Sequence, residues 1–139
     1  VESIGKKQPK AFHRKWHRKV KLEEIEEGVE AKAKEKELWF KLDPFILHVG
    51  ARDLEHARKI LLCMRKAGVK RGGIILAKRE KFLVEFHGTH VMALPIKSNG
   101  NLLVEKEYLS FLVEKANKKL SDNYARLKLF EQVCRKELK

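Results

Sequence analysis

The last part of the chain has the pattern of one long helix. No glycine or proline occurs after Gly100. Apolar side chains then recur every three or four positions, at Tyr108, Leu112, Ala116, Leu120, Tyr124, Leu127 and Phe130. Such a stripe lets a helix bury one face against other elements. We therefore expect one long helix, or two helices with a kink near Ser121.

Helix and strand patterns alternate ahead of this segment. Helical spacing covers 22–37 and a stretch that begins after an N-cap at Asp53 and ends at a C-cap glycine, Gly68. Period-two or short apolar patterns predict strands at 11–20, 38–42, 45–49, 74–77, 82–87, 91–96 and 102–104. Pro95 indicates an edge or a strand end.

The order of these elements predicts the fold class. A helix followed by two strands occurs at 22–49 and again at 53–87, which indicates a duplication. With the final helix, this order predicts a two-layer α+β domain with a mixed or antiparallel sheet. Arg71-Gly72-Gly73 is expected to be a loop between a helix and a strand. A Rossmann or Walker loop needs the opposite order, strand then glycines then helix, so those nucleotide folds are disfavoured.

The charge of the chain favours a polyanionic partner. The 139 residues carry a net charge of +13, and the isoelectric point is about 9.8. A domain this basic attracts nucleic acid, although solubility alone is the other interpretation.

The length suits a single domain, 1–139. Because the chain begins with Val1 and not with methionine, we also expect that the natural protein starts further upstream.

The apolar runs and the cysteines predict the compartment in which the protein acts. No apolar run approaches the length of a membrane span. Cys63 and Cys134 lie in helical patterns without disulfide or zinc spacing, which is typical of buried thiols in a reducing compartment. These features predict a cytoplasmic protein that contacts no membrane.

The basic segment near the N-terminus is the strongest candidate for RNA contact. Residues 1–19 contain seven Lys or Arg and one Glu. Cations bind phosphates, and an aromatic ring can stack on an unpaired base. We expect RNA contacts from Arg14, Lys15, Trp16, Arg18 and Lys19. The alternative for Trp16 is that its ring enters the core.

Histidines provide the other candidates for chemistry. His13 and His17 are four residues apart, but no third ligand is evident nearby, so we expect no metal site. His48 lies in an apolar strand, which is typical of a buried histidine. Gly88-Thr89-His90 interrupts a strand pattern, and such breaks often direct side chains into sites. The alternative is a surface bulge.

Taken in order, several motifs are similar to one family. They are Lys15-Trp16-His17-Arg18, Leu42-Asp43-Pro44-Phe45-Ile46-Leu47-His48-Val49, Asp53-Leu54 with Ala57, Ala67 through Ile74, Gly88-Thr89-His90 with Leu94-Pro95, and Glu107-Tyr108-Leu109 through Ala116-Asn117. From about Phe12 onward, the chain resembles the tRNA wybutosine-synthesis methyltransferases, as an archaeal-type member. It departs from them at Arg14, where archaeal relatives often carry glycine. It also lacks their upstream Ser- and Cys-containing motif ending in Gly-Arg.

The resemblance implies a function. It implies methyl transfer from S-adenosylmethionine to N4 of the wybutosine precursor at position 37, in the anticodon loop of phenylalanine tRNA. Matched by position, His17 and His90 are candidate catalytic bases. Gly88, Thr89 and Gly73 are expected to contact the cofactor. A non-catalytic RNA-binding module is the alternative function, and a structural protein that uses its long helix as a partner surface is a third.

Overall fold

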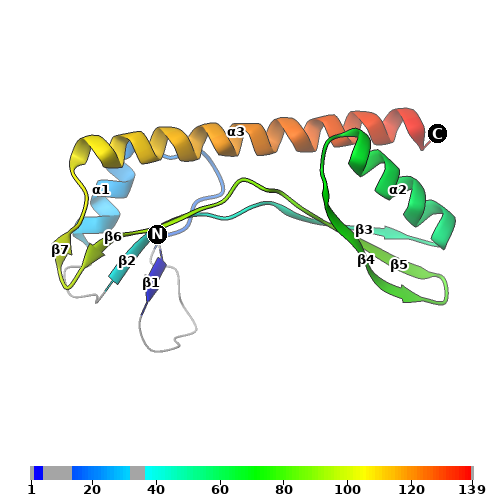
Figure 1. Ribbon diagram of the computed structural model, residues 1–139, viewed down its shortest axis with the longest axis horizontal. Helices are drawn as coiled ribbons and strands as arrows, with labels where there is room; N and C mark the ends of the chain where they lie inside the picture. The colour runs from blue at the N-terminus through cyan, green and yellow to red at the C-terminus, as the bar shows by residue number, and fades with distance from the viewer. Residues whose placement is uncertain (1, 5–13, 32–36, 139) are drawn as a thin grey trace. The chain divides into compact units, whose positions relative to one another are not determined.

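The computed structural model describes residues 2–4, 14–31 and 37–138. The elements along the chain are β1 (Glu2–Ile4), α1 (Leu22–Glu30), β2 (Glu37–Leu42), β3 (Ile46–Ala51), α2 (Leu54–Lys66), β4 (Arg71–Lys78), β5 (Lys81–His87), β6 (Met92–Ser98), β7 (Asn101–Leu102) and α3 (Lys106–Glu137). Figure 1 shows them. The α+β class and the long C-terminal helix are thereby confirmed, and α3 is one continuous helix.

The chain divides into two compact units. The first contains Val1–Asp43 and Val91–Leu120, and the second contains Pro44–His90 and Ser121–Lys139. Each unit has its own cluster of buried apolar side chains, and α3 contributes one part to each. The helix-strand-strand order does occur twice, but β2 and β3 belong to different sheets. Every strand pair in the described residues is antiparallel. The single domain over 1–139 stays a prediction.

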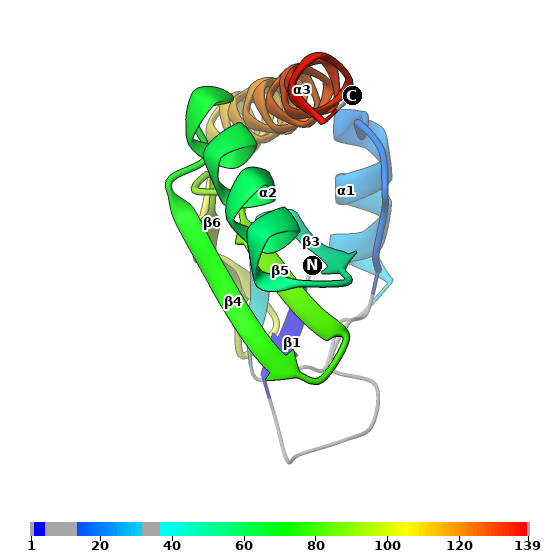
Figure 2. The same ribbon diagram turned by 90° about the vertical axis from the view of Figure 1, so that its right-hand side faces the viewer.

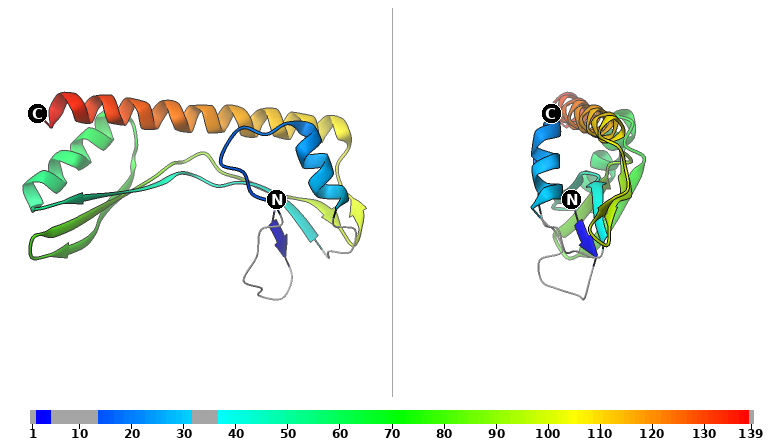
Figure 3. Two further views of the ribbon diagram at one scale, coloured as in Figure 1. Left: turned by 180° about the vertical axis from the view of Figure 1, so that it is seen from behind. Right: turned by 90° about the vertical axis from the view of Figure 1, so that its left-hand side faces the viewer.

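The first unit is a sheet covered on one face by helices. Its strand order is β1-β2-β6-β7. Its core combines α1, β2, β6 and the N-terminal part of α3 through Ile25, Val29, Leu38, Phe40, Ile96, Leu109, Leu112, Val113 and Ala116 (Figure 3). Pro95 pairs with Trp39 beside a shift in register. A bulge tolerates proline because it interrupts the hydrogen-bond ladder.

The second unit has the strand order β3-β5-β4, with α2 on one face of the sheet (Figure 2). As predicted, Asp53 is the N-cap of α2, where its carboxylate accepts the His56 N–H at 2.8 Å. Gly68 follows the helix with a φ of 75°, as a C-cap glycine does. The nearby Ala67 carbonyl accepts a hydrogen bond of 3.1 Å from Arg126 of α3.

The helix predicted over 22–37 is shorter than expected. It ends at Glu30, and Glu37 already begins β2. Residues 32–36 of that prediction lie outside the described residues. The buried Lys97 ammonium of β6 donates to the Val29 carbonyl at 2.8 Å, so a side chain from the sheet satisfies one of the last carbonyl groups of α1.

Two other predictions of local structure are wrong. The strand over 11–20 is absent from its described part, 14–20, which is irregular; residues 11–13 lie outside the described residues. The expected loop Arg71-Gly72-Gly73 is the start of β4. Gly72 has a φ of 146°, and a β-carbon there would lie 2.1 Å from the Glu85 carbonyl oxygen. Glycine is therefore needed for strand pairing at this position, and the glycine signal was mistaken for a turn.

Candidate functional site

The predicted RNA-contacting segment leads into α1 in the first unit. The Trp16 side chain is half-buried and packs against the core of that unit, together with Val20 and Leu22. Its ring therefore anchors the segment, which is the alternative that the sequence left open. Arg14, Lys15, His17, Arg18 and Lys19 are exposed around it. The segment thus presents cationic and imidazole groups from an anchored backbone.

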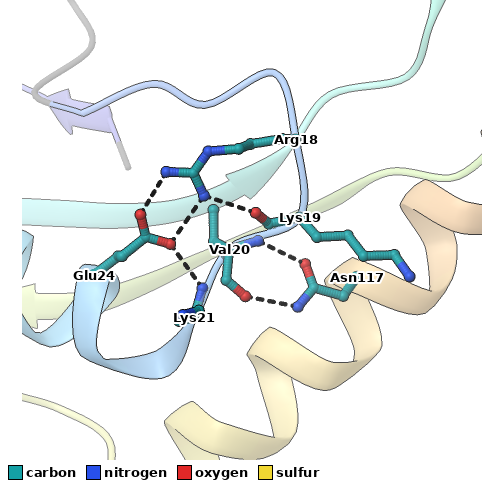
Figure 4. Close-up of polar contacts among 6 residues, drawn as sticks. All are labelled: Arg18, Lys19, Val20, Lys21, Glu24 and Asn117. Atoms are coloured by element: carbon teal, nitrogen blue, oxygen red, sulfur yellow. Dashed lines mark hydrogen bonds and ion pairs between the residues drawn. The ribbon is translucent and has the colours of Figure 1, made fainter.

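Asn117 of α3 fixes this backbone at Val20 (Figure 4). The Val20 N–H donates to Asn117 Oδ1 at 3.0 Å, and Asn117 Nδ2 donates to the Val20 carbonyl at 2.8 Å. One amide side chain therefore replaces the two hydrogen bonds that a neighbouring strand would make. In the sequence, Asn117 ends one of the matched motifs, and no local pattern indicates its role. Here it is a positioning residue for the segment.

Arg18 forms an ion pair with Glu24 in the first turn of α1 (Figure 4). The Arg18 guanidinium donates to the two carboxylate oxygens of Glu24 at 2.6 and 3.1 Å and to the Lys19 carbonyl at 2.9 Å. Glu24 also accepts the Lys21 N–H at 2.9 Å. The hydrogen bond from Arg18, followed by that from Lys21, lowers the pKa of Glu24 to about 2. Glu24 therefore holds the Arg18 end of the segment against α1.

Gly88, Thr89 and His90 follow β5 in the second unit, where the predicted interruption is confirmed. The Gly88 N–H donates to the Phe45 carbonyl at 2.8 Å, and a β-carbon at Gly88 would lie 2.8 Å from Phe45 Cδ1. Packing against Phe45 thus accounts for the glycine. Thr89 is exposed and His90 is half-buried. Among the described residues, neither side chain has a hydrogen-bond partner.

Gly73 lies apart from Gly88. It pairs with Glu85 across β4 and β5, three residues before Gly88 along the chain. At about 3.3 Å of rise per strand residue, this is a separation of roughly 10 Å. A β-carbon at Gly73 would meet nothing within 4 Å. The three predicted cofactor contacts therefore do not form one cluster, and only Gly88 and Thr89 are neighbours.

The two candidate bases belong to different units. His17 lies in the first unit and His90 lies in the second. His48, which was expected to be buried, is exposed on β3 and hydrogen-bonds to Glu85. This prediction was wrong because β3 has α2 on one face only, so its alternate side chains face outward.

Among the residues that the structure describes, no three His, Cys, Asp or Glu side chains gather as metal ligands would. None of the helices in that part of the chain has the length and apolar character needed to cross a bilayer. The second unit also holds a pocket of about 310 Å³, lined by Gly50, Ala51, Arg52, His56, Ile60 and Leu138. None of the predicted site residues lines this pocket.

Comparison with known proteins establishes the family. The sequence profile of the family described as Methyltransferase TYW3 matches residues 1–136. This chain belongs to the TYW3 family. The motifs that carried the resemblance, from Lys15-Trp16-His17 to Ala116-Asn117, lie inside the matched range.

Relatives in the TYW3 family cover most of the chain. A Thermococcus kodakarensis protein named tRNA(Phe) 7-((3-amino-3-carboxypropyl)-4-demethylwyosine(37)-N(4))-methyltransferase 1 is 38% identical over 122 residues, which is 88% of this chain and 61% of the relative. The tRNA wybutosine-synthesizing protein 3 homolog of Xenopus laevis is 38% identical over 98 residues, 70% of this chain and 39% of the relative. The chain thus spans less than two thirds of either protein.

Solved structures share the fold. The PH1069 protein of Pyrococcus horikoshii superimposes with a TM-score of 0.84 at 34% identity, over 95% of this chain and 67% of that one. A hypothetical protein from Aeropyrum pernix gives a TM-score of 0.78 at 24% identity, over 96% of this chain and 79% of that one, and supports the fold alone. Both likenesses agree with an α+β fold that is not of the Rossmann type.

Proposed function

We propose that the protein containing this chain is an S-adenosylmethionine-dependent methyltransferase. Its substrate would be N4 of the wybutosine precursor at position 37 of phenylalanine tRNA. The family match over residues 1–136 carries this proposal. The name of the Thermococcus kodakarensis relative, which states the tRNA, the position and the methylated nitrogen, supports the same substrate. We expect the enzyme to act in the cytoplasm.

The charge of the chain supports a tRNA substrate. A net charge of +13 attracts the phosphate backbone and accelerates encounter. Arg14, Lys15 and Lys19 are exposed on the segment that Asn117 fixes, which places three positive charges at the surface. Because the Trp16 ring packs on the core, its main proposed role is to hold these cations in place. Position 37 lies in the anticodon loop, where unpaired bases are accessible.

Of the three predicted cofactor contacts in the second unit, only Thr89 suits a bound cofactor. When bound, S-adenosylmethionine supplies a methyl group already activated by a sulfonium. Thr89 offers an exposed hydroxyl, which can donate and accept hydrogen bonds with the polar groups of such a cofactor. Gly88 does not fit as a glycine for close ligand approach, because the Phe45 ring fills the space that a β-carbon would occupy. Gly73 has open space instead, yet it lies away from Thr89.

The reaction also needs a proton acceptor. S-adenosylmethionine would supply the methyl group, and the proton that N4 carries would have to pass to a base. A neutral imidazole accepts such a proton near neutral pH. His17 and His90 are the proposed acceptors. His90 is half-buried, and its ring has no hydrogen-bond partner among the described residues, which leaves it available to a substrate.

A methyl-transfer assay tests the proposal. The full-length protein is incubated with S-adenosylmethionine and hypomodified phenylalanine tRNA, and the nucleoside at position 37 is analysed by mass spectrometry. We expect a gain of one methyl group on N4 of the tricyclic base. No transfer to that base would overturn the proposal.

A non-catalytic tRNA-binding module is the second candidate, and the basic exposed segment around Trp16 favours it. Such a module would bind tRNA in a salt-sensitive manner without affinity for S-adenosylmethionine. Titration calorimetry with the cofactor separates the two candidates. A heat of binding that saturates at one cofactor per chain supports the enzyme, and tRNA binding without that heat supports the module.

A further inference from the structure

The second unit has one sheet face that points away from α2. Along β5, Val84 and Phe86 join the core beneath α2, so Leu83, Glu85 and His87 point the other way. Strand register places their neighbours on the same face. We call this surface the open face of the sheet; it consists of Ile46, His48 and Gly50 of β3, Lys81, Leu83, Glu85 and His87 of β5, and Arg71, Gly73, Leu76 and Lys78 of β4.

Glu85 lies at the centre of the open face between two histidines. His48 pairs with it across the strands and donates from Nε2 to Glu85 Oε2 at 2.6 Å. His87 Nε2 donates to the other oxygen, Oε1. The hydrogen bond from His48, followed by that from His87, lowers the pKa of Glu85. The carboxylate therefore stays ionised, and each oxygen keeps a further lone pair for another donor.

Two glycines leave the backbone beside these groups uncovered. Gly73 pairs with Glu85 on the β4 side, and Gly50 pairs with Leu83 on the β3 side. A β-carbon at either glycine would meet nothing within 4 Å. A flat ligand could thus approach the sheet close to the Glu85 carboxylate. Figure 1 shows α2 on one side of β3, β4 and β5.

Cationic side chains lie at both ends of the open face. Arg71 pairs with His87 at one end of the hairpin, and Lys78 pairs with Lys81 at the other. All three cations are exposed. Like charges directly across a strand pair are destabilising. Among the described residues, no carboxylate forms an ion pair with Lys78 or Lys81. A phosphate placed between these two lysines would relieve their repulsion.

We infer that the open face binds an unpaired stretch of RNA, with phosphates at Arg71, Lys78 and Lys81 and a guanine edge at Glu85. Guanine is the base that fits, because its imino and amino N–H groups lie side by side as a carboxylate requires. An open sheet that presents uncovered backbone and cations is a surface that unpaired RNA uses. The inference rests on the proposed function in one respect, since the RNA would be the tRNA substrate.

Binding to tRNA tests the surface. Gly73→Val adds a branched side chain in open space, which β-strands accept, and places it beside Glu85. We expect it to weaken binding of a phenylalanine tRNA transcript about tenfold without lowering the melting temperature. Arg71→Ala is expected to weaken binding and to reduce the salt slope by about 1. Arg58→Ala is the matched control, because Arg58 is exposed on α2. This substitution removes the same charge as Arg71→Ala, but away from the open face.

A base substitution tests the role of Glu85. Short unpaired RNA with a central guanosine is compared with the same RNA carrying inosine, which lacks the amino group. We expect the intact protein to bind the guanosine oligonucleotide about tenfold more tightly, and Glu85→Ala to lose this preference. If Gly73→Val and Arg71→Ala bind tRNA as Arg58→Ala does, the surface is overturned. If guanosine and inosine bind equally well to the intact protein, the guanine assignment is overturned.

These outcomes are separable from a failure of the proposed function. If tRNA binding depends on Gly73 and Arg71 but no methyl group is transferred, the surface stands and the methyltransferase proposal fails. If methyl transfer proceeds and the Gly73→Val and Arg71→Ala variants match the control in both assays, the methyltransferase proposal stands and the surface fails.

Discussion

The Asn117 side chain holds the backbone of Val20 by both of its polar groups. Its oxygen accepts the Val20 N–H at 3.0 Å, and its nitrogen donates to the Val20 carbonyl at 2.8 Å. These residues lie 97 positions apart, so a local sequence pattern contains no trace of the pairing. Because the contact joins the segment before α1 to α3 within the first unit, it determines where Trp16, His17 and Arg18 lie.

Asn117→Ala is therefore expected to destabilise the chain by about 1–3 kcal/mol, because two half-buried backbone groups lose their partner. Asn117→Asp keeps the acceptor but sets a carboxylate oxygen against the Val20 carbonyl, so it should destabilise the chain at least as much. Denaturant unfolding measures the free energy, and hydrogen exchange at the Val20 amide reports the contact itself. Lys118→Ala, at an exposed neighbouring position, is the control. Unchanged exchange at Val20 in Asn117→Ala would contradict the role assigned to this side chain.

The pair of Arg18 and Glu24 predicts a dependence on acid. The pKa of Glu24 is about 2 when folded against an ordinary 4.5, so its contribution to stability is present above about pH 4.5 and is lost as the pH falls towards 2. Glu24→Gln should lower the melting temperature at neutral pH, and the difference from the wild type should shrink in acid. Glu23→Gln, exposed in the same helical turn, is the control. A difference that persists unchanged at about pH 2 would refute this account.

Gly88 and Gly73 are expected to respond oppositely to the same substitution. Gly88→Ala places a β-carbon 2.8 Å from the Phe45 ring and should cost about 1–3 kcal/mol. Gly73→Ala places it in open space, and alanine should stabilise that strand position by up to about 1 kcal/mol. Urea unfolding of the two variants makes the comparison. Equal effects would show that packing against Phe45 does not account for Gly88.

The thiol of Cys134 is expected to be unreactive. Burial, followed by the neighbouring Cys63 thiol, raises the pKa of Cys134 to about 12. The thiolate is the reactive form, so at about pH 8 the reactive fraction falls by about a thousandfold relative to an ordinary thiol. Iodoacetamide should therefore label Cys134 far more slowly in the native protein than in guanidinium, as measured by peptide mass spectrometry. Equal labelling rates in the two conditions would disprove the shift.

The two candidate bases can be separated by substitution. Replacing the acceptor of the N4 proton should lower kcat by about 10²–10⁴-fold and leave tRNA binding nearly unchanged. His17→Gln and His90→Gln are compared with His56→Gln, since His56 bonds to the N-cap Asp53 of α2 and has no proposed role in the reaction. Single-turnover methylation across pH measures the effect. If both variants keep the wild-type rate and pH profile, neither histidine is the base.

Local patterns predicted the elements whose formation depends on neighbouring residues. The long final helix, the N-cap at Asp53 and the glycine at Gly68 all lie where the sequence indicated, although Tyr108 and Tyr124 of the predicted buried stripe are exposed. Helical periodicity and capping act over a few residues, so they are visible in sequence. The basic segment around Trp16 was likewise recognised, although its strand form was wrong.

The other features depend on which segments meet. Gly72 and Gly73 indicated a loop, whereas the approach of the Glu85 backbone makes Gly72 a strand residue. The apolar strand around His48 indicated a buried side chain. That side chain instead points to the open face, because α2 packs on the other face.

The sequence by itself determined the helices, the caps of α2, the basic character of the chain and its similarity to the TYW3 family, because these reside in residue type and short-range spacing. Only the tertiary structure decided that Asn117 fixes the irregular segment at Val20, that β2 and β3 enter different sheets, and that His48, Glu85 and His87 share one face. The physical reason is that backbone hydrogen bonds and carboxylates need specific partners, and here those partners are distant in the chain.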